Sequence, residues 1–294
     1  MIRLLVLGDL NLDVHAEEPS PTACGQEIRS TVRVTPGGSA GTFARVAAKL
    51  GADVTFLGVV GNDSVGDLLE RDLVACGIRP HLRRTERPSG VVLALHRGSD
   101  RSMICSRGAN DALDEDDVDP TLFVGVHHLH VSGYAFLSES QARAARRAIA
   151  LARAVGATVS VNAPPANLME SLGLDLFGEE LRDATFLILN RDEGRLLTGC
   201  NEDAAIVDAL AASHAAGALT VGSQGALAWR GEERNLTRPA AALDVDPTGA
   251  GDAYAAAFVV RLLAGDGLAA VNRTACATAG AHLAAPWTQR ASPS

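Results

Sequence analysis

Lysine is almost absent from this chain of 294 residues. Only one of its 26 basic residues, Lys49, is a lysine, and the rest are arginines. A Walker A loop needs its lysine between a glycine and a serine or threonine, whereas Lys49 lies between Ala48 and Leu50. A Schiff-base enzyme needs a desolvated lysine, and a protein kinase needs one in a Val-Ala-Ile-Lys strand. The sequence therefore argues against all three classes.

Aromatic residues and positive charge are also scarce. Aromatics make up 4% of the chain against 47% hydrophobic residues, so alanine, valine and leucine must build most of the core. Acidic residues outnumber basic ones by 35 to 26, which gives a net charge of −9. Because nucleic acids and anionic membranes attract basic surfaces, we expect neither as a partner. Backbone amides can still bind a phosphate without any side-chain charge.

Long hydrophobic runs and paired cysteines are missing as well. The apolar run Ala253–Val260 ends at Arg261, well short of a membrane span, and the apolar stretch at the N-terminus is too short for a signal-peptide core. The five cysteines are widely spaced and form no Cys-x-x-Cys pair. This usage is typical of reduced thiols, so we expect a cytoplasmic protein.

Short apolar runs alternate with helical patterns along the chain. Nearly continuous apolar character predicts buried strands at Leu4–Leu7, Val54–Val60, Val126–Val131, Thr158–Val161, Phe186–Leu189 and Leu219–Val221. Between the first strands, apolar residues at helical spacing lead up to Gly51 and to Gly77, which predicts helices that end at glycine caps. The alternation predicts an α/β domain over residues 1–294, with a mostly parallel sheet flanked by helices on both faces.

Two stretches interrupt this alternation. Residues Ile28–Thr35 alternate polar and apolar side chains, and Ser89–Cys105 contains two β-rich runs around the turn Arg97–Asp100. Half-exposed strands do not belong in a buried parallel sheet. We therefore predict a small separate β-sheet, inserted at about 12–35 and 88–106, that acts as a lid.

The strongest chemical signal is the segment Asp246-Pro-Thr-Gly-Ala-Gly-Asp-Ala-Tyr254, which precedes a predicted helix. Its glycines permit a tight turn and leave the amides of Gly249, Ala250 and Gly251 at the helix N-terminus, where anions bind. Asp252 follows in the first turn of the helix, where the helix dipole favours its ionised form. A carboxylate beside an anion hole is what proton abstraction during phosphoryl transfer requires.

This segment resembles the C-terminal signature of the ribokinase-like, PfkB-type carbohydrate kinases. Residues Gly37–Ala44, read on to Gly51, are similar to the N-terminal signature of that family, and Gly58–Gly66 follows in the usual order. The resemblance covers about residues 4–285. It implies a ribokinase-like fold, ATP and Mg²⁺ as cofactors, and phosphorylation of a hydroxyl on a small sugar or sugar acid.

The resemblance also implies roles for individual residues. Asp252 would be the base, with Gly249, Ala250 and Gly251 as the anion hole. Positions that would bind the substrate are Asn11, Asp13, Gly37, Gly38, Ser39 and Thr42. Positions that would bind the nucleotide are Asn190, Glu193, Thr220, Gly222, Ser223, Gly225 and, by a looser match, Asn272. Glu193 would act on Mg²⁺ through water, and Asp246 and Thr248 match part of a monovalent-cation (K⁺) site of some members.

The substrate end departs from ribokinases proper and leaves alternatives open. Ser39 and Thr42 stand where ribokinases have a lysine and an asparagine that contact ribose, and Val131–Tyr134 lacks their sugar-contacting glutamate. These differences count against ribose. A nucleoside kinase of the same fold is one alternative, with Phe43 or Tyr134 stacked on the base. A non-catalytic sugar or nucleotide sensor is another, although a sensor normally loses the base or the anion hole.

Three features stay outside this assignment. His127, His128 and His130 form a cluster without an evident further ligand, so we predict packing and hydrogen bonding there, not a metal site. Arg107 lies where the predicted lid rejoins the domain, and it could reach a substrate phosphate or serve at the surface. The sequence also leaves open whether two copies form a homodimer through their lids.

Overall fold

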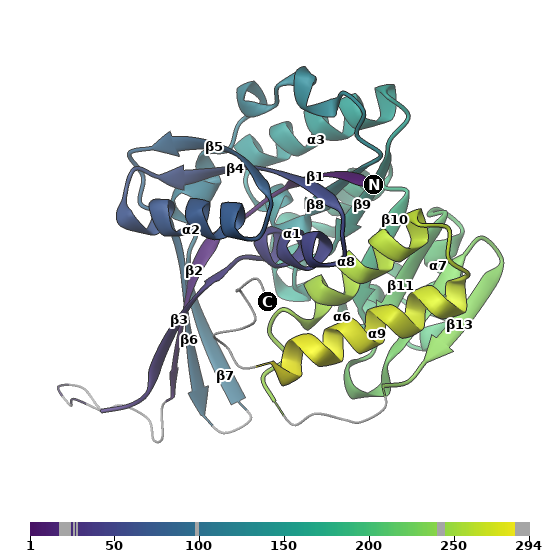
Figure 1. Cartoon of the computed structure of the whole chain (residues 1–294). Helices are drawn as coiled ribbons and strands as arrows, with labels where there is room; N and C mark the ends of the chain where they lie inside the picture. The colour runs from purple at the N-terminus through teal and green to yellow at the C-terminus, as the bar shows by residue number, and fades with distance from the viewer. Residues whose placement is uncertain (18–24, 26, 28, 98–99, 240–244, 286–294) are drawn as a thin grey trace.

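The computed structural model describes residues 1–17, 25, 27, 29–97, 100–239 and 245–285. Within these residues the strands form two sheets (Figure 1). The larger sheet has nine strands in the spatial order β13-β12-β11-β10-β9-β8-β1-β4-β5. Their bounds in chain order are β1 Arg3–Leu7, β4 Asp53–Gly61, β5 Arg79–Thr85, β8 His128–Ser132, β9 Thr158–Asn162, β10 Phe186–Asn190, β11 Ala216–Thr220, β12 Ala226–Arg230 and β13 Glu233–Thr237. All neighbours from β5 to β11 pair in parallel, and β12 and β13 add an antiparallel edge.

Helices cover both faces of the larger sheet, as the sequence predicts. One face carries α1 Ser39–Lys49, α2 Ser64–Ala75, α8 Ala250–Leu263 and α9 Leu268–Ala284. The other carries α3 Glu139–Ala154, α4 Ala166–Leu172, α5 Leu174–Leu181, α6 Arg191–Thr198 and α7 Asp203–Ala211. Short 3₁₀ turns connect several of them: η1 Gly108–Ala112, η2 Glu115–Asp117, η3 Pro120–Phe123, η4 Gly133–Leu137 and η5 Gly222–Gln224. Each face of the sheet therefore has its own apolar core.

Strand β11 begins earlier than its apolar residues predict. It spans Ala216–Thr220 instead of Leu219–Val221, because its first residues are small and give little apolar signal. The fully buried Trp229 of β12 fills the space beside them, and a Cβ atom at Gly217 would lie 2.4 Å from the Trp229 ring. A large ring on the neighbouring strand thus requires a small residue here.

The small sheet is confirmed, and it extends away from the larger one (Figure 1). Its order is β3-β2-β6-β7, with the bounds β2 Asn11–Glu17, β3 Val32–Gly37, β6 Gly90–Arg97 and β7 Asp100–Ser106. The predicted hairpin is the β6–β7 pair, and β2–β3 is also antiparallel. Strands β2 and β6 pair in parallel in the middle. Part of the predicted lid, between β2 and β3, lies outside the described residues.

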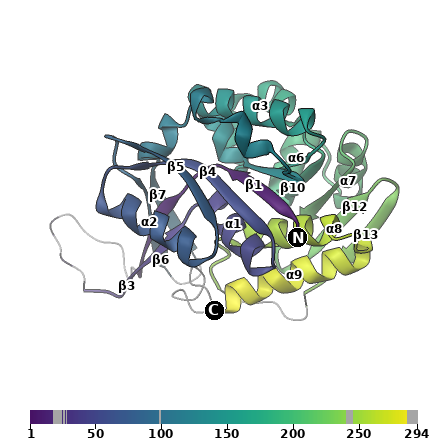
Figure 2. The ribbon, with the colours of Figure 1, turned by 45° about the horizontal axis from the view of Figure 1, so that its top comes forward.

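The carboxyl ends of the parallel strands define the edge at which ligands bind in folds of this kind. Asp9 follows β1, and Asn162 and Asn190 end β9 and β10. Helices α1 and α8 lie side by side against the middle of the sheet in both ribbon views (Figures 1 and 2). No helix in the described part of the chain is long and apolar enough to span a membrane.

Candidate active site

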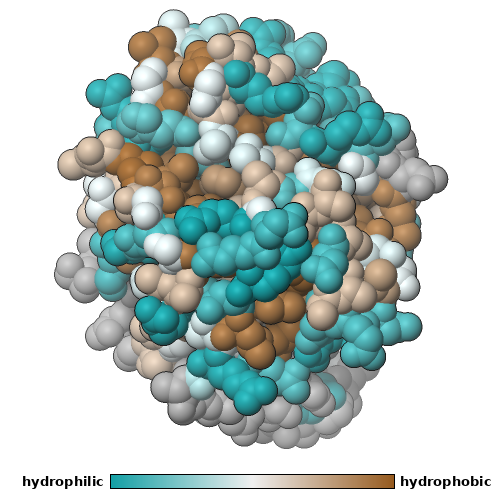
Figure 3. Space-filling model, turned by 90° about the vertical axis from the view of Figure 1, so that its right-hand side faces the viewer, coloured by the Kyte–Doolittle hydropathy of each residue, from teal (hydrophilic) through white to brown (hydrophobic). Residues whose placement is uncertain are grey.

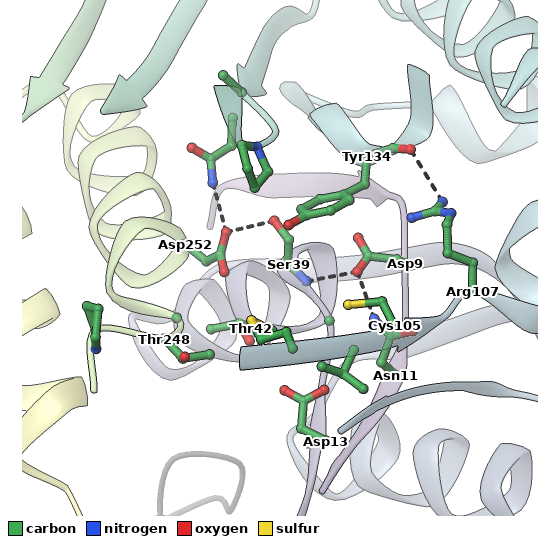
Figure 4. Close-up of a pocket in the computed structure, with 18 of the residues that line it drawn as sticks. Asp9, Asn11, Asp13, Ser39, Thr42, Cys105, Arg107, Tyr134, Thr248 and Asp252 are labelled. Carbon is green, nitrogen blue, oxygen red and sulfur yellow. Dashed lines mark hydrogen bonds between the residues drawn. The ribbon is translucent and has the colours of Figure 1, made fainter. Parts of the chain in front are cut away.

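A pocket of about 270 Å³ lies between this edge of the larger sheet and the small sheet (Figure 4). It brings together predicted site residues from distant parts of the chain: Asn11, Asp13, Gly38, Ser39, Thr42, Glu193, Thr248, Gly249 and Asp252. The pocket also contains residues that the sequence did not single out, of which Asp9 and Asn162 form hydrogen bonds with predicted ones. Both ends of the chain therefore build one site.

Asp252 lies in the first turn of α8 and points into the pocket. One of its oxygens, Oδ1, accepts hydrogen bonds from Ser39 Oγ at 2.7 Å and from Asn162 Nδ2 at 2.8 Å. Burial raises the pKa of Asp252 to about 7, with the charge of Asp9 acting in the same direction and the two hydrogen bonds opposing it. A carboxylate that titrates near pH 7 is well matched to general-base catalysis.

The turn before α8 differs in one detail from the sequence-based prediction of three outward amides. Gly249 begins the helix in a left-handed conformation, with φ at 79°. The Ala250 amide donates to the Pro247 carbonyl at 3.1 Å, which closes the turn. The amides of Gly249 and Gly251 have no hydrogen-bond partner among the described residues. Two amides, together with the helix dipole, are therefore available for an anion.

Asp9 organises the floor of the pocket. It is 3% exposed, and its carboxylate accepts hydrogen bonds from Asn11 Nδ2, from the Ser39 amide and from Ser132 Oγ, each at 3.1 Å. Asn11 in turn accepts a hydrogen bond from Asn110 Nδ2 at 2.8 Å. The signal that could have identified Asp9 is its place: an acidic residue directly beyond the first buried strand, at the edge where ligands bind.

Asp13 faces the pocket from β2 (Figure 4). Burial raises its pKa to about 7, and the charges of Asp9 and Asp246 add to the increase while Arg45 lowers it. Its Oδ1 atom is buried without a hydrogen-bond partner among the described residues. A Cβ atom at Gly37 would lie 2.0 Å from Asp13 Oδ2, so a larger residue there would displace this carboxylate. An acceptor held in this way is suited to bind a substrate hydroxyl.

Arg45 of α1 holds the segment around Gly37 in place through hydrogen bonds to its backbone. Its side chain is buried, with an Nη1 hydrogen bond of 3.0 Å to Asp72 Oδ2 of α2. Its Nη2 atom donates to the carbonyls of Pro36 at 3.1 Å and of Gly37 at 3.2 Å. Arg45 is therefore a positioning residue: it ties α1 and α2 to the strand that borders the pocket.

Asn190 and Glu193 form a capping box at the start of α6. Glu193 Oε2 accepts from the Asn190 amide at 2.7 Å, and Oε1 accepts from Asn190 Nδ2 at 2.6 Å. Burial raises the pKa of Glu193 to about 8, and the charge of Asp252 contributes. Glu193 lines the pocket with Asp252, so the pair links the pocket to the ends of β10 and β11.

The remaining predicted nucleotide residues lie outside this pocket. Thr220 pairs with Asn190 across β11 and β10, and Gly222, Ser223 and Gly225 form the turn that follows. Asn272 of α9 is fully buried: it donates to the carbonyls of Ala226 at 3.0 Å and Asn235 at 2.9 Å, and it accepts from Tyr254 at 2.7 Å. Asn272, which the sequence matched loosely to an adenine contact, therefore lies in the core, where it joins α9 to β12 and β13.

Arg107 and Tyr134 form the wall of the pocket beside the small sheet (Figure 4). Arg107 donates to Asp111 at 2.6 Å, to Gln141 at 2.5 Å and to the Tyr134 carbonyl at 3.3 Å. Among the described residues that line the pocket, Arg107 is the one with a cationic side chain, against the acidic Asp9, Asp13, Glu193 and Asp252.

Two of the three clustered histidines, His128 and His130, lie on β8 and have the packing role that the sequence predicts. His128 hydrogen-bonds to Thr158 and to Ser160, both at 2.7 Å. His130 hydrogen-bonds to Ser160 at 2.8 Å and stacks on Phe43 with ring centroids 3.5 Å apart. Burial holds the pKa of His130 well below its usual value. Both rings therefore belong to the core.

A mostly parallel sheet covered on both faces, a small sheet over its carboxyl edge and a half-buried aspartate at a helix N-terminus are typical of an α/β phosphotransferase with an alcohol group as acceptor. A family model described as pfkB family carbohydrate kinase matches residues 1–294. The chain belongs to this family of sugar kinases.

Three similar proteins illustrate the relationship. The ribokinase of Bacillus subtilis is 27% identical over 280 residues, which cover 94% of this chain and 90% of that protein. The ATP-dependent ribose-1-phosphate kinase of Halopiger xanaduensis is 30% identical over 276 residues, 90% of this chain and 86% of that protein. The crystal structure of adenosine kinase from Sinorhizobium meliloti superposes with a TM-score of 0.87 at 22% identity, over 97% of this chain and 94% of that one. The last likeness concerns the fold.

Proposed function

We propose that this protein is an ATP-dependent, Mg²⁺-requiring kinase that phosphorylates a hydroxyl of a small carbohydrate. The observation that carries the proposal is Asp252: a half-buried carboxylate that lies both in the substrate pocket and beside the amides at the start of α8. One group can therefore reach a substrate hydroxyl while the adjacent amides hold an anion. The name of the ATP-dependent relative from Halopiger supports ATP as the donor.

In the proposed mechanism, Asp13 and the Asn11–Asp9 pair hold the hydroxyls of the sugar in front of Asp252. Asp252 takes the proton of the attacking hydroxyl onto its carboxylate. Ser39 and Asn162 hold that carboxylate in place and keep its pKa from rising further. The amides of Gly249 and Gly251 stabilise the negative charge that develops on the oxygens of the transferred group.

The residues present fit MgATP. The two amides without described partners at the start of α8 suit a phosphate, and Glu193 offers a hard oxygen donor of the kind that suits Mg²⁺, directly or through water. When bound, MgATP supplies the phosphoryl group and the cation that offsets its charge. Asn190, Thr220 and the Gly222–Gly225 turn lie along the same edge, where we place the rest of the nucleotide. A monovalent-cation role for Asp246 and Thr248 stays a prediction, tested by comparing rates in potassium and tetramethylammonium salts.

The small sheet is proposed to close over the bound substrate. Its strand β2 carries Asn11 and Asp13, so substrate contacts and closure are coupled. Closure would exclude water and so limit hydrolysis of ATP.

The charges of the pocket favour a substrate without a phosphate. Asp9, Asp13, Glu193 and Asp252 line the pocket, and the cation of Arg107 is already shared with Asp111 and Gln141. Carboxyl oxygens accept hydroxyl donors, whereas a phosphate on the sugar would find no cationic side chain among these residues that is not already paired. We therefore expect neutral sugars to be better substrates than their phosphates in an ADP-release assay over sugars, sugar acids, sugar phosphates and nucleosides. A clear preference for a sugar phosphate or a nucleoside would contradict this assignment of the substrate.

The replacement Asp252→Asn tests the base. We expect turnover to fall by about 10²–10⁴-fold, because the amide cannot accept the proton, while nucleotide binding persists. The matched control is Asp208→Asn on α7, whose side chain is 70% exposed, and it should leave turnover unchanged. Undiminished turnover in Asp252→Asn would show that another group is the base. Absence of turnover in the wild-type protein, with sugar binding retained, would favour the sensor instead.

The small sheet also supports a proposal of dimerisation. One face of it carries the apolar row Val34, Val14, Leu93 and Ile104, one residue from each strand. Val34 is 54% exposed and Ile104 is 62% exposed, which leaves an apolar surface at the end of the molecule. A second copy of the same sheet is the partner that we propose. The cysteines Cys105, Cys200 and Cys276 are free thiols, which supports a cytoplasmic setting.

A further inference from the structure

A second cluster of ligand-type side chains lies at the rim of the pocket, where the small sheet meets the segment before α8. It consists of His15 on β2, His96 on β6 and Asp246. One ligand atom from each residue lies within 4.8 Å of those of the other two. Within the residues that the structure describes, no other group of three such side chains comes this close together.

The strand register explains why the two imidazoles meet. Side chains alternate between the faces of a strand, so His15 lies on the same face as Asp13, toward the pocket. In the parallel β2–β6 pair, His15 is opposite Ala94 and Glu17 is opposite His96. His96 is therefore the diagonal neighbour of His15 on that face, and the rings stack with centroids 5.3 Å apart.

The distances suit one small ion. His15 Nδ1 and His96 Nε2 are 3.0 Å apart, and His96 Nε2 is 4.0 Å from Asp246 Oδ2. Ligand atoms about 2.0–2.1 Å from a tetrahedral zinc ion lie roughly 3.3 Å from one another, between these two values. An ion between these atoms would replace the hydrogen bond that joins the two imidazoles.

The surroundings also resemble those of a metal ligand set. His15 is 3% exposed, and the side chains of His96 and Asp246 are 17% and 12% exposed. The other carboxylate oxygen of Asp246, Oδ1, accepts from the Thr248 amide at 3.1 Å and from Thr248 Oγ1 at 2.8 Å. These hydrogen bonds orient the carboxylate with Oδ2 toward the imidazoles, as partners behind a ligand do in metal sites.

We propose that His15, His96 and Asp246 bind a divalent ion of the zinc type, with water as the fourth ligand. Imidazole nitrogen combined with one carboxylate selects zinc, cobalt or nickel over Mg²⁺, which prefers oxygen ligands. The site is therefore separate in chemistry from the MgATP site, and its formation does not depend on kinase activity.

An ion bound here would tie the small sheet to the segment that leads into the catalytic turn. Two ligands come from the small sheet, and Asp246 precedes Gly249 and Asp252 by only a few residues. Since the small sheet must open to release product in the proposed function, zinc should inhibit turnover and Mg²⁺ should not. This consequence rests on the proposed function, whereas binding of the ion does not.

The test is a cobalt titration of the full-length protein after dialysis against a chelator. Cobalt in a tetrahedral site of this kind gives visible absorption, and we expect saturation at one ion per chain, with zinc displacing the cobalt. The variants His15→Asn and His96→Asn should each weaken binding at least about tenfold, as loss of a ligand requires. The control His81→Asn replaces an exposed histidine of β5 and should bind as the wild type does.

Thermal unfolding of each variant checks that the fold is intact. If His96→Asn does not fold, His96→Gln is measured in its place. Cobalt affinity that is unchanged in both histidine variants, or a wild type that does not bind cobalt at micromolar concentrations, overturns the site. Binding without zinc inhibition of ADP release keeps the site but overturns its effect on closure. Absence of ADP release by the zinc-free protein in the presence of MgATP and the sugar panel contradicts only the proposed function.

Discussion

At the scale of single residues, the balance between burial and hydrogen bonding at Asp252 should set the pH range of the proposed reaction. Burial raises the pKa of Asp252 to about 7. The base acts only when ionised, so kcat/KM should decrease as the pH falls through about 7 and level off above it. The measurement is a pH profile of kcat/KM for the best sugar in the panel. A profile without an acidic limb between pH 5 and 8 would contradict this role.

A second prediction at this scale concerns the hydrogen bond between Ser39 and Asp252. Its hydroxyl donates to Asp252 at 2.7 Å, and this bond stabilises the ionised carboxylate. In Ser39→Ala the pKa of Asp252 should rise, so the acidic limb of kcat/KM should move to higher pH. Ser140→Ala removes a hydroxyl bound to Asp114, and neither residue lines the pocket, so this control should not move the limb. If Ser39 serves only as a sugar contact, KM will increase with no shift of the limb.

At the scale of elements, Arg45 joins α1, α2 and the end of β3. The ion pair with Asp72 is nearly buried, with side chains 5% and 12% exposed. Removing one partner of such a pair leaves a buried charge, so Arg45→Ala should lower the free energy of unfolding by about 3–5 kcal/mol. KM for the sugar should also increase, because the Gly37 carbonyl loses its anchor.

Denaturant unfolding measures the loss, and Arg71→Ala, an exposed arginine on the same α2, is the control. The double variant Arg45→Met with Asp72→Leu should recover part of the stability, since no charge is then left without a partner. A loss below about 1 kcal/mol in Arg45→Ala would mean that the pair is solvated in solution.

At the scale of the whole molecule, the distribution of apolar surface predicts the assembly. The side of β13 and α7 is largely hydrophilic, with smaller apolar areas between (Figure 3). The small sheet at the other end exposes Val32, Val34 and Ile104 by 58%, 54% and 62%. Val34→Glu and Ile104→Glu should therefore convert a dimer to a monomer in sedimentation experiments. Val74→Glu, with a valine 58% exposed on α2, should remain dimeric. A wild-type protein that is monomeric at every concentration would exclude this assembly.

Much of the fold could be predicted because its signals are local. The apolar runs of β1 and β4, the glycine that ends the first helix and the hairpin at Arg97–Asp100 each depend on residues close in sequence. The turn around Gly249, which we propose as the anion site, was identified for the same reason. The start of strand β11 was predicted too late in the chain because its first residues are small. They are small because the Trp229 ring of the neighbouring strand fills the space beside them, and this contact is not visible in the local sequence.

The sequence by itself determined the family, the α/β alternation and the identity of the aspartate proposed as base. Only the tertiary structure decided which groups surround that aspartate: Ser39 is 213 residues away in the chain and Asn162 is 90 residues away. It also decided that the Ala250 amide closes a turn and that His15, His96 and Asp246 meet. The physical reason is that turns and periodic faces follow from neighbouring residues, whereas these contacts depend on strand order and register, which bring distant segments to one edge of the sheet.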